Sequence, residues 1–342
     1  MNTHDYFEVA VAEVIQKTPD AISISFDIPL ELQGLFSYQS GQFVTLRVSV
    51  AGKIRHRCYS LCSAPGLDAR PTIAIKRVDG GLVSNMLCSD VAAGTRLSVQ
   101  PPAGHFVPPR FDGDFVLAAG GSGITPILSI IKSALAHGSG KIFLIYANRD
   151  EKSVIFSDDI IQLMNAHPDR FTAYHWLESV QGLPATVNLA ALLSGWSDAQ
   201  MFICGPAPFM EAASRAGEAA GLADDRIHLE KFVSLPDEPD DDDATAASGT
   251  AMASELTVSL DGKEHRVQWS AGKKLLDAML DAGLDAPYSC KVGGCSACMC
   301  RVLEGCVTMG ESLILSQQER DEGWTLACQA VAASPTVHIE IL

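Results

Sequence analysis

The sequence predicts three domains: a small antiparallel β-barrel, an α/β domain with a parallel sheet, and a separate C-terminal domain. Short apolar runs separated by turn signals fill the first third of the chain, which is typical of a barrel. A fully apolar strand, a glycine-rich turn and an apolar helix then begin a new domain. Four cysteines, at positions 290, 295, 298 and 328, mark the C-terminal one. With 342 residues, the chain can form two or three domains with their own cores.

The barrel is predicted for residues 1–112. Its apolar runs lie at 21–28, 43–50, 72–78 and 96–99. Two polar groups of residues interrupt this pattern and offer a cation, a flat aromatic ring, hydroxyls and a helix-starting turn. They are Arg57, Tyr59 and Ser60, and further on Gly81, Ser84 and Asn85. A flavin requires such groups at its ring and phosphates, although an arginine and a tyrosine on one strand are ordinarily an exposed ion and a half-buried ring.

The α/β domain is predicted for residues 113–232. A buried strand at 115–119, a helix at 125–136 and further strands at 141–146 and 200–204 indicate a parallel sheet. Each of two strands ends in a distinctive turn.

The first of these turns contains Gly121, Gly123, Thr125 and Pro126. Its glycines permit close approach of a ligand, and the helix that follows offers free amides to a pyrophosphate. The second turn, Cys204, Gly205 and Pro206, follows a later strand. Ligands collect at the carboxyl edge of a parallel sheet, although either turn alone can serve packing.

Cys290, Cys295 and Cys298 form a Cys-x4-Cys-x2-Cys pattern, and Cys328 follows after 29 intervening residues. This is the plant-type [2Fe-2S] ligand spacing. The glycine-rich loop lets backbone amides turn toward the sulfurs. The alternatives are a structural zinc site, a dithiol redox centre and scattered core cysteines. Zinc usually takes paired CxxC sequences, and a dithiol needs no further partners.

Between the last two domains, residues 233–254 predict a flexible acidic linker that contains four consecutive aspartates. The formal net charge of −16 argues against nucleic acid as a partner. Residues 255–342 carry five more acidic than basic side chains, which predicts a salt-sensitive encounter with a basic protein surface. We find no signal peptide and no membrane-length apolar run, so we expect a cytoplasmic protein without membrane contact.

The ordered motifs resemble the ferredoxin-NADP reductase superfamily with a C-terminal plant-type ferredoxin, over essentially the whole chain. The motifs are Arg57-x-Tyr59-Ser60, Gly81-x-x-Ser84, Gly120-Gly121-x-Gly123-Ile124-Thr125-Pro126, Cys204-Gly205-Pro206-x-x-Phe209-Met210 and the four cysteines. Residues 146–156 and 175–184 look like the phenylacetyl-CoA oxygenase reductase-like group, in particular the reductase components of 3-ketosteroid 9α-hydroxylases. The resemblance implies an α+β domain with the β-grasp fold for the ferredoxin domain at 255–342.

The resemblance also implies residue roles. Arg57 would meet the flavin phosphates, Tyr59 would stack on the ring, and Ser60 would approach N5. Ser84 with Asn85 would hold the flavin pyrophosphate. Residues of the α/β domain would serve the pyridine nucleotide: Gly121, Gly123 and Thr125 would bind it, Cys204 and Gly205 would lie near the nicotinamide, and Phe232 would be a gate over the flavin, unless it is a core aromatic.

Electron counting predicts the order of the cofactors. NADH delivers two electrons together and an iron-sulfur cluster accepts one, so a flavin must stand between them. The resemblance implies FAD, NADH and a Rieske-type terminal oxygenase that hydroxylates a steroid nucleus.

Several alternatives remain open from the residues themselves. FMN could replace FAD. Arg149 could receive the phosphate of NADPH, although Asp150 and Glu151 would repel it. The oxygenase could act on an aromatic acid or an acyl-CoA, and the C-terminal domain could be a non-enzymatic zinc or redox-sensing module.

Overall fold

The computed structural model describes residues 5–232, 253–260, 262–310, 312, 314, 315 and 317–341. They belong to two compact units: the larger comprises most of residues 5–232, and the smaller contains the C-terminal domain. The predicted acidic linker at 233–254 lies outside the described residues except for Ala253 and Ser254.

Six antiparallel strands form the first sheet, in the order β4-β3-β6-β1-β2-β5. An antiparallel bridge between Leu61 and Ile73 joins the end of β4 to β5, so the two edges of the sheet meet as in a barrel. Ala51 and Gly52 connect β3 to β4 with positive φ angles of 53° and 76°, which suit a tight hairpin turn. The elements are β1 (Phe7–Thr18), β2 (Ala21–Asp27), η1 (Leu30–Leu32), β3 (Phe43–Val50), β4 (Lys53–Ser60), β5 (Thr72–Lys76), α1 (Leu82–Asp90) and β6 (Arg96–Ala103).

Five parallel strands form the second sheet, in the order β11-β10-β7-β8-β9. The elements are β7 (Phe115–Gly120), η2 (Gly121–Gly123), α2 (Ile124–His137), β8 (Ile142–Asn148), η3 (Glu151–Ser153), α3 (Ser157–Ala166), β9 (Phe171–Leu177), α4 (Glu178–Gln181), α5 (Thr186–Leu192), β10 (Gln200–Gly205), α6 (Ala207–Ala219), η4 (Asp224–Arg226) and β11 (Ile227–Lys231).

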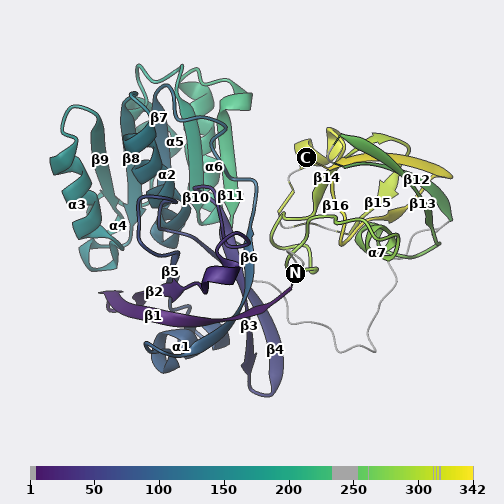
Figure 1. The fold of residues 1–342 in the computed structure, drawn as a ribbon. Helices are drawn as coiled ribbons and strands as arrows, with labels where there is room; N and C mark the ends of the chain where they lie inside the picture. Colours follow the sequence, from purple (N-terminus) through teal and green to yellow (C-terminus); the bar gives the residue numbers. More distant parts are fainter. Residues whose placement is uncertain are drawn as a thin grey trace. The chain divides into compact units, whose positions relative to one another are not determined.

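Both faces of this parallel sheet are covered by helices (Figure 1). Along β7, Phe115 and Leu117 belong to one core with residues of α2 and α3. Their neighbours Val116 and Ala118 belong to another core with residues of α5 and α6. Alternate side chains point to opposite faces of a strand, so the unbroken apolar run of β7 feeds two cores.

The barrel and the parallel sheet share a core, because Cys62 and Ala74 of the barrel cluster with residues of α2. Polar contacts reinforce the junction. The Ser129 hydroxyl donates to the Ser63 carbonyl at 2.6 Å, and Lys132 Nζ lies 2.9 Å from Asp68 Oδ2. The barrel therefore packs against the parallel sheet through a shared apolar core, a buried hydrogen bond and a partly exposed ion pair.

The C-terminal unit has a five-stranded mixed sheet in the order β13-β12-β18-β14-β16. Its central pair, β12 and β18, is parallel, and the residues of α7 pack into the core on one face. The elements are β12 (Ser254–Leu260), β13 (Lys263–Trp269), α7 (Leu275–Asp281), β14 (Met299–Glu304), β15 (Val307–Thr308), α8 (Gln317–Asp321), β16 (Trp324–Leu326), β17 (Val331–Ala332) and β18 (Thr336–Ile341). This is the β-grasp arrangement, so the predicted fold class is confirmed in all three parts.

Among the helices of the described residues, none is both long and apolar enough to span a membrane.

Candidate functional site

The strand order of the parallel sheet reverses between β7 and β10. From β7 the chain proceeds outward to β8 and β9, and it then returns to place β10 and β11 on the other side. Ala119 of β7 pairs in register with Cys204 of β10, so both strands end at the same level. Such a switch point leaves a crevice at the carboxyl edge, where ligands bind in open α/β sheets.

The two turns predicted from the sequence meet at this point. A Cβ added at Gly123 would lie 2.1 Å from the carbonyl oxygen of Cys204, and one at Gly205 would lie 2.9 Å from Gly120 Cα. Only glycine permits this approach of two backbones. Gly123 and Gly205 therefore hold the two turns together, a packing role in addition to the ligand contacts expected of them.

Gly121 faces a more open space. Its φ of 53° is in the left-handed region, and a Cβ placed on it would have Lys76 Nζ as a neighbour at 3.8 Å. No side chain of the described structure caps η2 or α2, so the first amides of the turn are not occupied by a capping group. Thr125 is buried and donates from Oγ1 to the Ser122 carbonyl at 3.0 Å. The turn fits a pyrophosphate group.

Lys76 escaped the sequence analysis, since a lysine at a strand end is ordinarily a surface residue. The side chain is half-buried, and burial lowers the pKa of Lys76, while Asp20 acts in the opposite direction. A cation above a glycine turn complements an anionic ligand. In the sequence, Lys76 is marked only by its position at the end of β5. Its proximity to Gly121 depends on how the barrel packs against the parallel sheet, which is a feature of the tertiary structure.

Cys204 is fully buried at the end of β10. Burial raises the pKa of Cys204 well above its usual value, and the nearby Glu230 adds to the effect. The Cys204 side chain is therefore a neutral thiol at neutral pH rather than a nucleophilic thiolate.

Glu230, on β11, pairs in register with Cys204 and was given no role from the sequence. Burial raises the pKa of Glu230 to about 8, although the side chain keeps part of its surface exposed. A protonated carboxyl beside the sheet edge can donate a hydrogen bond or carry a proton. Phe232, two residues further, is 44% exposed and is the last residue described before Ala253.

The predicted flavin residues lie on β4 and α1. Arg57 donates from Nη1 to the His56 carbonyl at 2.8 Å. Tyr59 is half-buried and packs against the barrel core, while Ser60 is buried at the end of the strand.

Ser84 and Asn85 shape the turn before α1. The Val78 amide donates to Ser84 Oγ at 3.1 Å, and Asn85 Nδ2 donates to the Val78 carbonyl at 3.0 Å and to the Gly81 carbonyl. Helix α1 begins after Gly81 without a side-chain cap. The two side chains thus fold the turn so that the helix amides stay available for a phosphate, which fits the expected flavin pyrophosphate.

The four predicted cluster ligands lie together in the C-terminal unit, each at most 6% exposed. Their thiols form two contacting pairs, Cys290 with Cys295 and Cys298 with Cys328. The Gly294 amide donates to Cys290 Sγ at 3.3 Å, and the Cys290 amide donates to Cys295 Sγ at 3.4 Å. Hydrogen bonding from Cys298, aided by Gln329 and the Gly293 amide, lowers the pKa of Cys328 to about 7.

Two pairs of thiols fit two irons, since each iron of a [2Fe-2S] cluster takes two cysteine ligands. The loop reaches this shape through left-handed residues, among them Lys291 and Ser296 with φ of 55°. Such strained non-glycine residues persist where the surrounding structure requires them.

Known families match each of the three parts. An oxidoreductase FAD-binding domain matches residues 8–107, an oxidoreductase NAD-binding domain matches 117–215, and a 2Fe-2S iron-sulfur cluster binding domain matches 258–333. The chain is 44% identical, over 97% of its length and 96% of the relative's, to a 3-ketosteroid-9-alpha-monooxygenase ferredoxin reductase component from Rhodococcus rhodochrous. This chain belongs to the family of monooxygenase ferredoxin reductase components.

Two more distant likenesses, one of sequence and one of fold, were found. A component of the 1,2-phenylacetyl-CoA epoxidase of Escherichia coli is 32% identical over 98% of this chain and 97% of its own. The solved structure of phthalate dioxygenase reductase has the same fold, with a TM-score of 0.59, 22% identity and 98% coverage of both chains. The protein is therefore an oxidoreductase with FAD, NAD and [2Fe-2S] domains. FMN and a zinc module are not supported.

Proposed function

We propose that the protein carries electrons from NADH, by way of FAD and a [2Fe-2S] cluster, to a Rieske-type terminal oxygenase that 9α-hydroxylates 3-ketosteroids. The central support is that one chain combines two features. The glycine turn at residues 120–126, called the nucleotide turn below, lies at the switch point of the parallel sheet, and two pairs of thiols are buried in the C-terminal unit. A family member with 44% identity over nearly the full chain is named for the 3-ketosteroid reaction.

The bound FAD and cluster supply the conversion of a two-electron hydride donor into single electrons. The protein's own residues bind and align. Gly121, Thr125 and the α2 amides would hold the nucleotide pyrophosphate, and Lys76 would neutralise part of its charge. Gly123 and Gly205 would set the depth of the crevice, and Cys204 would be a neutral, water-free wall beside the nicotinamide.

On the flavin side, Arg57 would meet the phosphates and Tyr59 would stack on the ring. Ser60 would approach the reactive edge, and Ser84 with Asn85 would present the α1 amides to the pyrophosphate. Glu230 would place a protonated carboxyl near Cys204, and Phe232 would cover the flavin until the nicotinamide enters. Cys290, Cys295, Cys298 and Cys328 would hold the cluster.

NADH is favoured over NADPH by the charges at the end of β8. Arg149 Nη2 lies 3.3 Å from Asp20 Oδ2, so the cation that could receive a 2′-phosphate already has an acidic partner. Asp150 accepts from the Ser153 amide at 3.0 Å, which holds a second carboxylate in this region. A phosphate there would meet net negative charge.

A cytoplasmic location fits the cysteines, since none of the ten is paired in a disulfide. A different oxygenase is the second candidate, because the phenylacetyl-CoA epoxidase component is also a full-length relative. Adding purified 3-ketosteroid and acyl-CoA oxygenases separately, and recording NADH consumed per hydroxylated steroid or per oxygenated acyl-CoA, distinguishes the two. Coupled turnover only with the acyl-CoA oxygenase would refute the steroid assignment.

The order of electron transfer is tested with Cys298→Ser. We expect the variant to lose NADH-driven cytochrome c reduction, because the cluster is downstream of the flavin, and to retain most ferricyanide reduction. Cys306→Ser is the control, since Cys306 is an exposed thiol outside the two ligand pairs. An equal loss of both activities in Cys298→Ser would contradict the proposed order.

A further inference from the structure

Gln329 follows the fourth cluster cysteine directly and lies against the loop that carries the other three. Its Nε2 donates to Cys328 Sγ at 3.4 Å and to the Lys291 carbonyl at 3.1 Å. An amide NH₂ has two hydrogens, and the two acceptors use both. The side chain therefore joins the sulfur of one segment to the backbone of the other.

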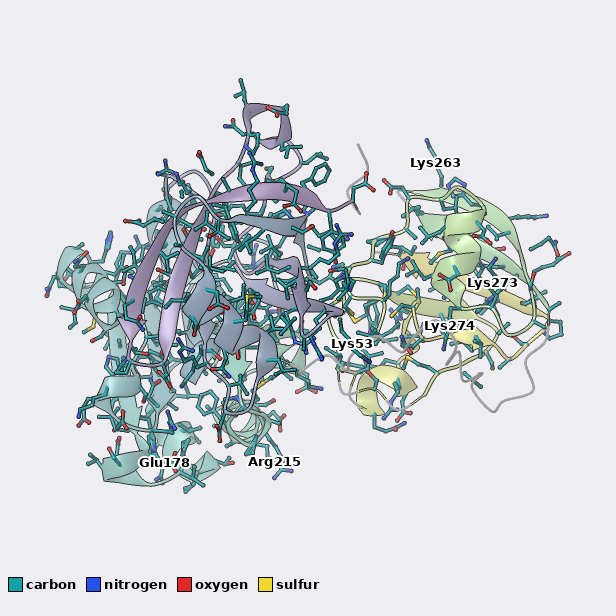
Figure 2. The ribbon with its side chains drawn as sticks, turned by 90° about the horizontal axis from the view of Figure 1, so that it is seen from below. Lys53, Glu178, Arg215, Lys263, Lys273 and Lys274 are labelled. Carbon is teal, nitrogen blue, oxygen red and sulfur yellow. The ribbon has the colours of Figure 1, made fainter. Side chains whose placement is uncertain are left out.

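The surroundings are shaped to hold this side chain. Gly293 has a φ of 76°, and a Cβ on it would lie 2.9 Å from Gln329 Cγ, so the absence of a side chain there makes room for the glutamine. Lys274 precedes α7 and is labelled in Figure 2; its Nζ donates to the Gln329 carbonyl at 3.0 Å. Both the backbone and the side chain of Gln329 are thus held in place.

We propose that Gln329 is a positioning residue that raises the reduction potential of the [2Fe-2S] cluster through its hydrogen bond to Cys328 Sγ. This rests on the proposed function, in which Cys328 is a cluster ligand. One-electron reduction adds negative charge that spreads onto the ligating sulfurs. A fixed N–H donor stabilises that charge more in the reduced cluster than in the oxidised one.

This donor differs from the backbone amides of Gly294 and Cys290, which donate to two other ligand sulfurs. Backbone amides remain after any substitution of a side chain, whereas the Gln329 donor can be removed alone. The electron acceptor downstream would then receive electrons from a cluster whose potential is set partly by one replaceable side chain.

The experiment is a potentiometric titration of the isolated holoprotein, in which electron paramagnetic resonance measures the fraction of reduced cluster at each potential. Gln329→Met keeps the length of the side chain and removes the donor. We expect the equilibrium constant for one-electron reduction to fall about tenfold, which corresponds to about 59 mV toward lower potential. Gln268→Met is the matched control, because Gln268 is exposed on β13, and its cluster potential should equal that of the wild type.

Gln329→Glu is the second variant. It keeps the packing against Gly293 but replaces the donor with an anion, so its potential should fall further than that of Gln329→Met. Unchanged potentials in both variants would overturn the inference. So would loss of bound iron in both, because Gln329 would then assemble the site rather than tune it. A wild-type protein without a cluster would instead overturn the proposed function.

Discussion

The hydroxyl of Tyr146 donates a hydrogen bond to the carbonyl of Gly121 at 3.0 Å, from the neighbouring strand to the nucleotide turn. The same hydroxyl oxygen accepts from the Ile155 amide at 3.2 Å. Tyr146 is fully buried, so the turn after β7 and the segment after η3 are joined through one protected oxygen. This support matters for Gly121, because its backbone is in the left-handed region.

We therefore predict that Tyr146→Phe weakens nucleotide binding. Losing a buried hydrogen bond costs about 1 kcal/mol, so KM for NADH should rise about fivefold while kcat changes little. Steady-state ferricyanide reduction gives both constants. Tyr38→Phe is the control, since the Tyr38 hydroxyl lies 2.7 Å from Ser63 Oγ in the barrel. An equal rise in KM in both variants would show only general loosening.

The contact between Gly123 and Cys204 predicts the effect of a single methyl group. In Gly123→Ala the new Cβ would lie 2.1 Å from a backbone carbonyl, which cannot move as a side chain can. We expect a loss of about 2 kcal/mol in stability and a rise in KM for NADH. Thermal unfolding measures the first. Gly34→Ala is the control, because no atom lies within 4 Å of the added Cβ, and it should leave stability and KM for NADH unchanged. A Gly123→Ala protein with the stability and KM of the wild type would disprove the close contact.

Glu230 predicts a pH dependence of stability. A carboxyl whose pKa is about 8 when folded keeps a proton that the unfolded chain loses near pH 4.5, so stability falls as pH rises from about 4.5 to about 8. Glu230→Gln imitates the protonated state. It should match the wild type at pH 5 and be more stable at pH 9, by about 1 kcal/mol, since the group is partly exposed. Urea unfolding of both proteins across this range measures the difference, and a pH-independent difference would refute the raised pKa.

The pair of Arg149 and Asp20 predicts the preference between nucleotides. In Asp20→Asn the arginine loses its acidic partner, so kcat/KM for NADPH should rise about fivefold while that for NADH stays within about twofold. Asp27→Asn is the control, because its pair with Arg70, at 3.8 Å, lies elsewhere in the barrel. Equal responses to NADH and NADPH would mean that Arg149 does not face the 2′ position.

Apolar runs located the barrel strands well. The runs at 21–28, 43–50, 72–78 and 96–99 correspond to β2, β3, β5 and β6. No apolar run was assigned to β1 or to β4. Arg57 and Tyr59 were expected on one strand, but the bounds of β4 were not predicted, because its polar sequence Lys-Ile-Arg-His-Arg-Cys-Tyr-Ser has no apolar run. Its strand pairing comes from the hairpin at Ala51 and Gly52 and from the bridge at Leu61. Pairing partners lie outside the strand, so its own residues could not reveal it.

Glu230, Lys76 and Gln329 escaped the sequence analysis for a related reason. Each is an ordinary polar residue whose neighbours come from another part of the chain: Cys204 on β10, Gly121 after β7, and the loop of Lys291. A residue type and a local pattern cannot specify a contact made across strands. Strand register, domain packing and loop shape determine it.

The sequence by itself determined which chemistry is present, because the cysteine spacing and the glycine turns are local requirements of the groups that they bind. Apolar periodicity also indicated the barrel and the parallel α/β sheet, and the order of the motifs indicated the β-grasp domain through the family resemblance. Only the tertiary structure decided which distant residues meet in a site. Strand order brings Gly123 against Cys204, and folding of the C-terminal domain brings Cys298 to Cys328. Local geometry is encoded within a few residues, whereas contacts between distant segments depend on burying a common core.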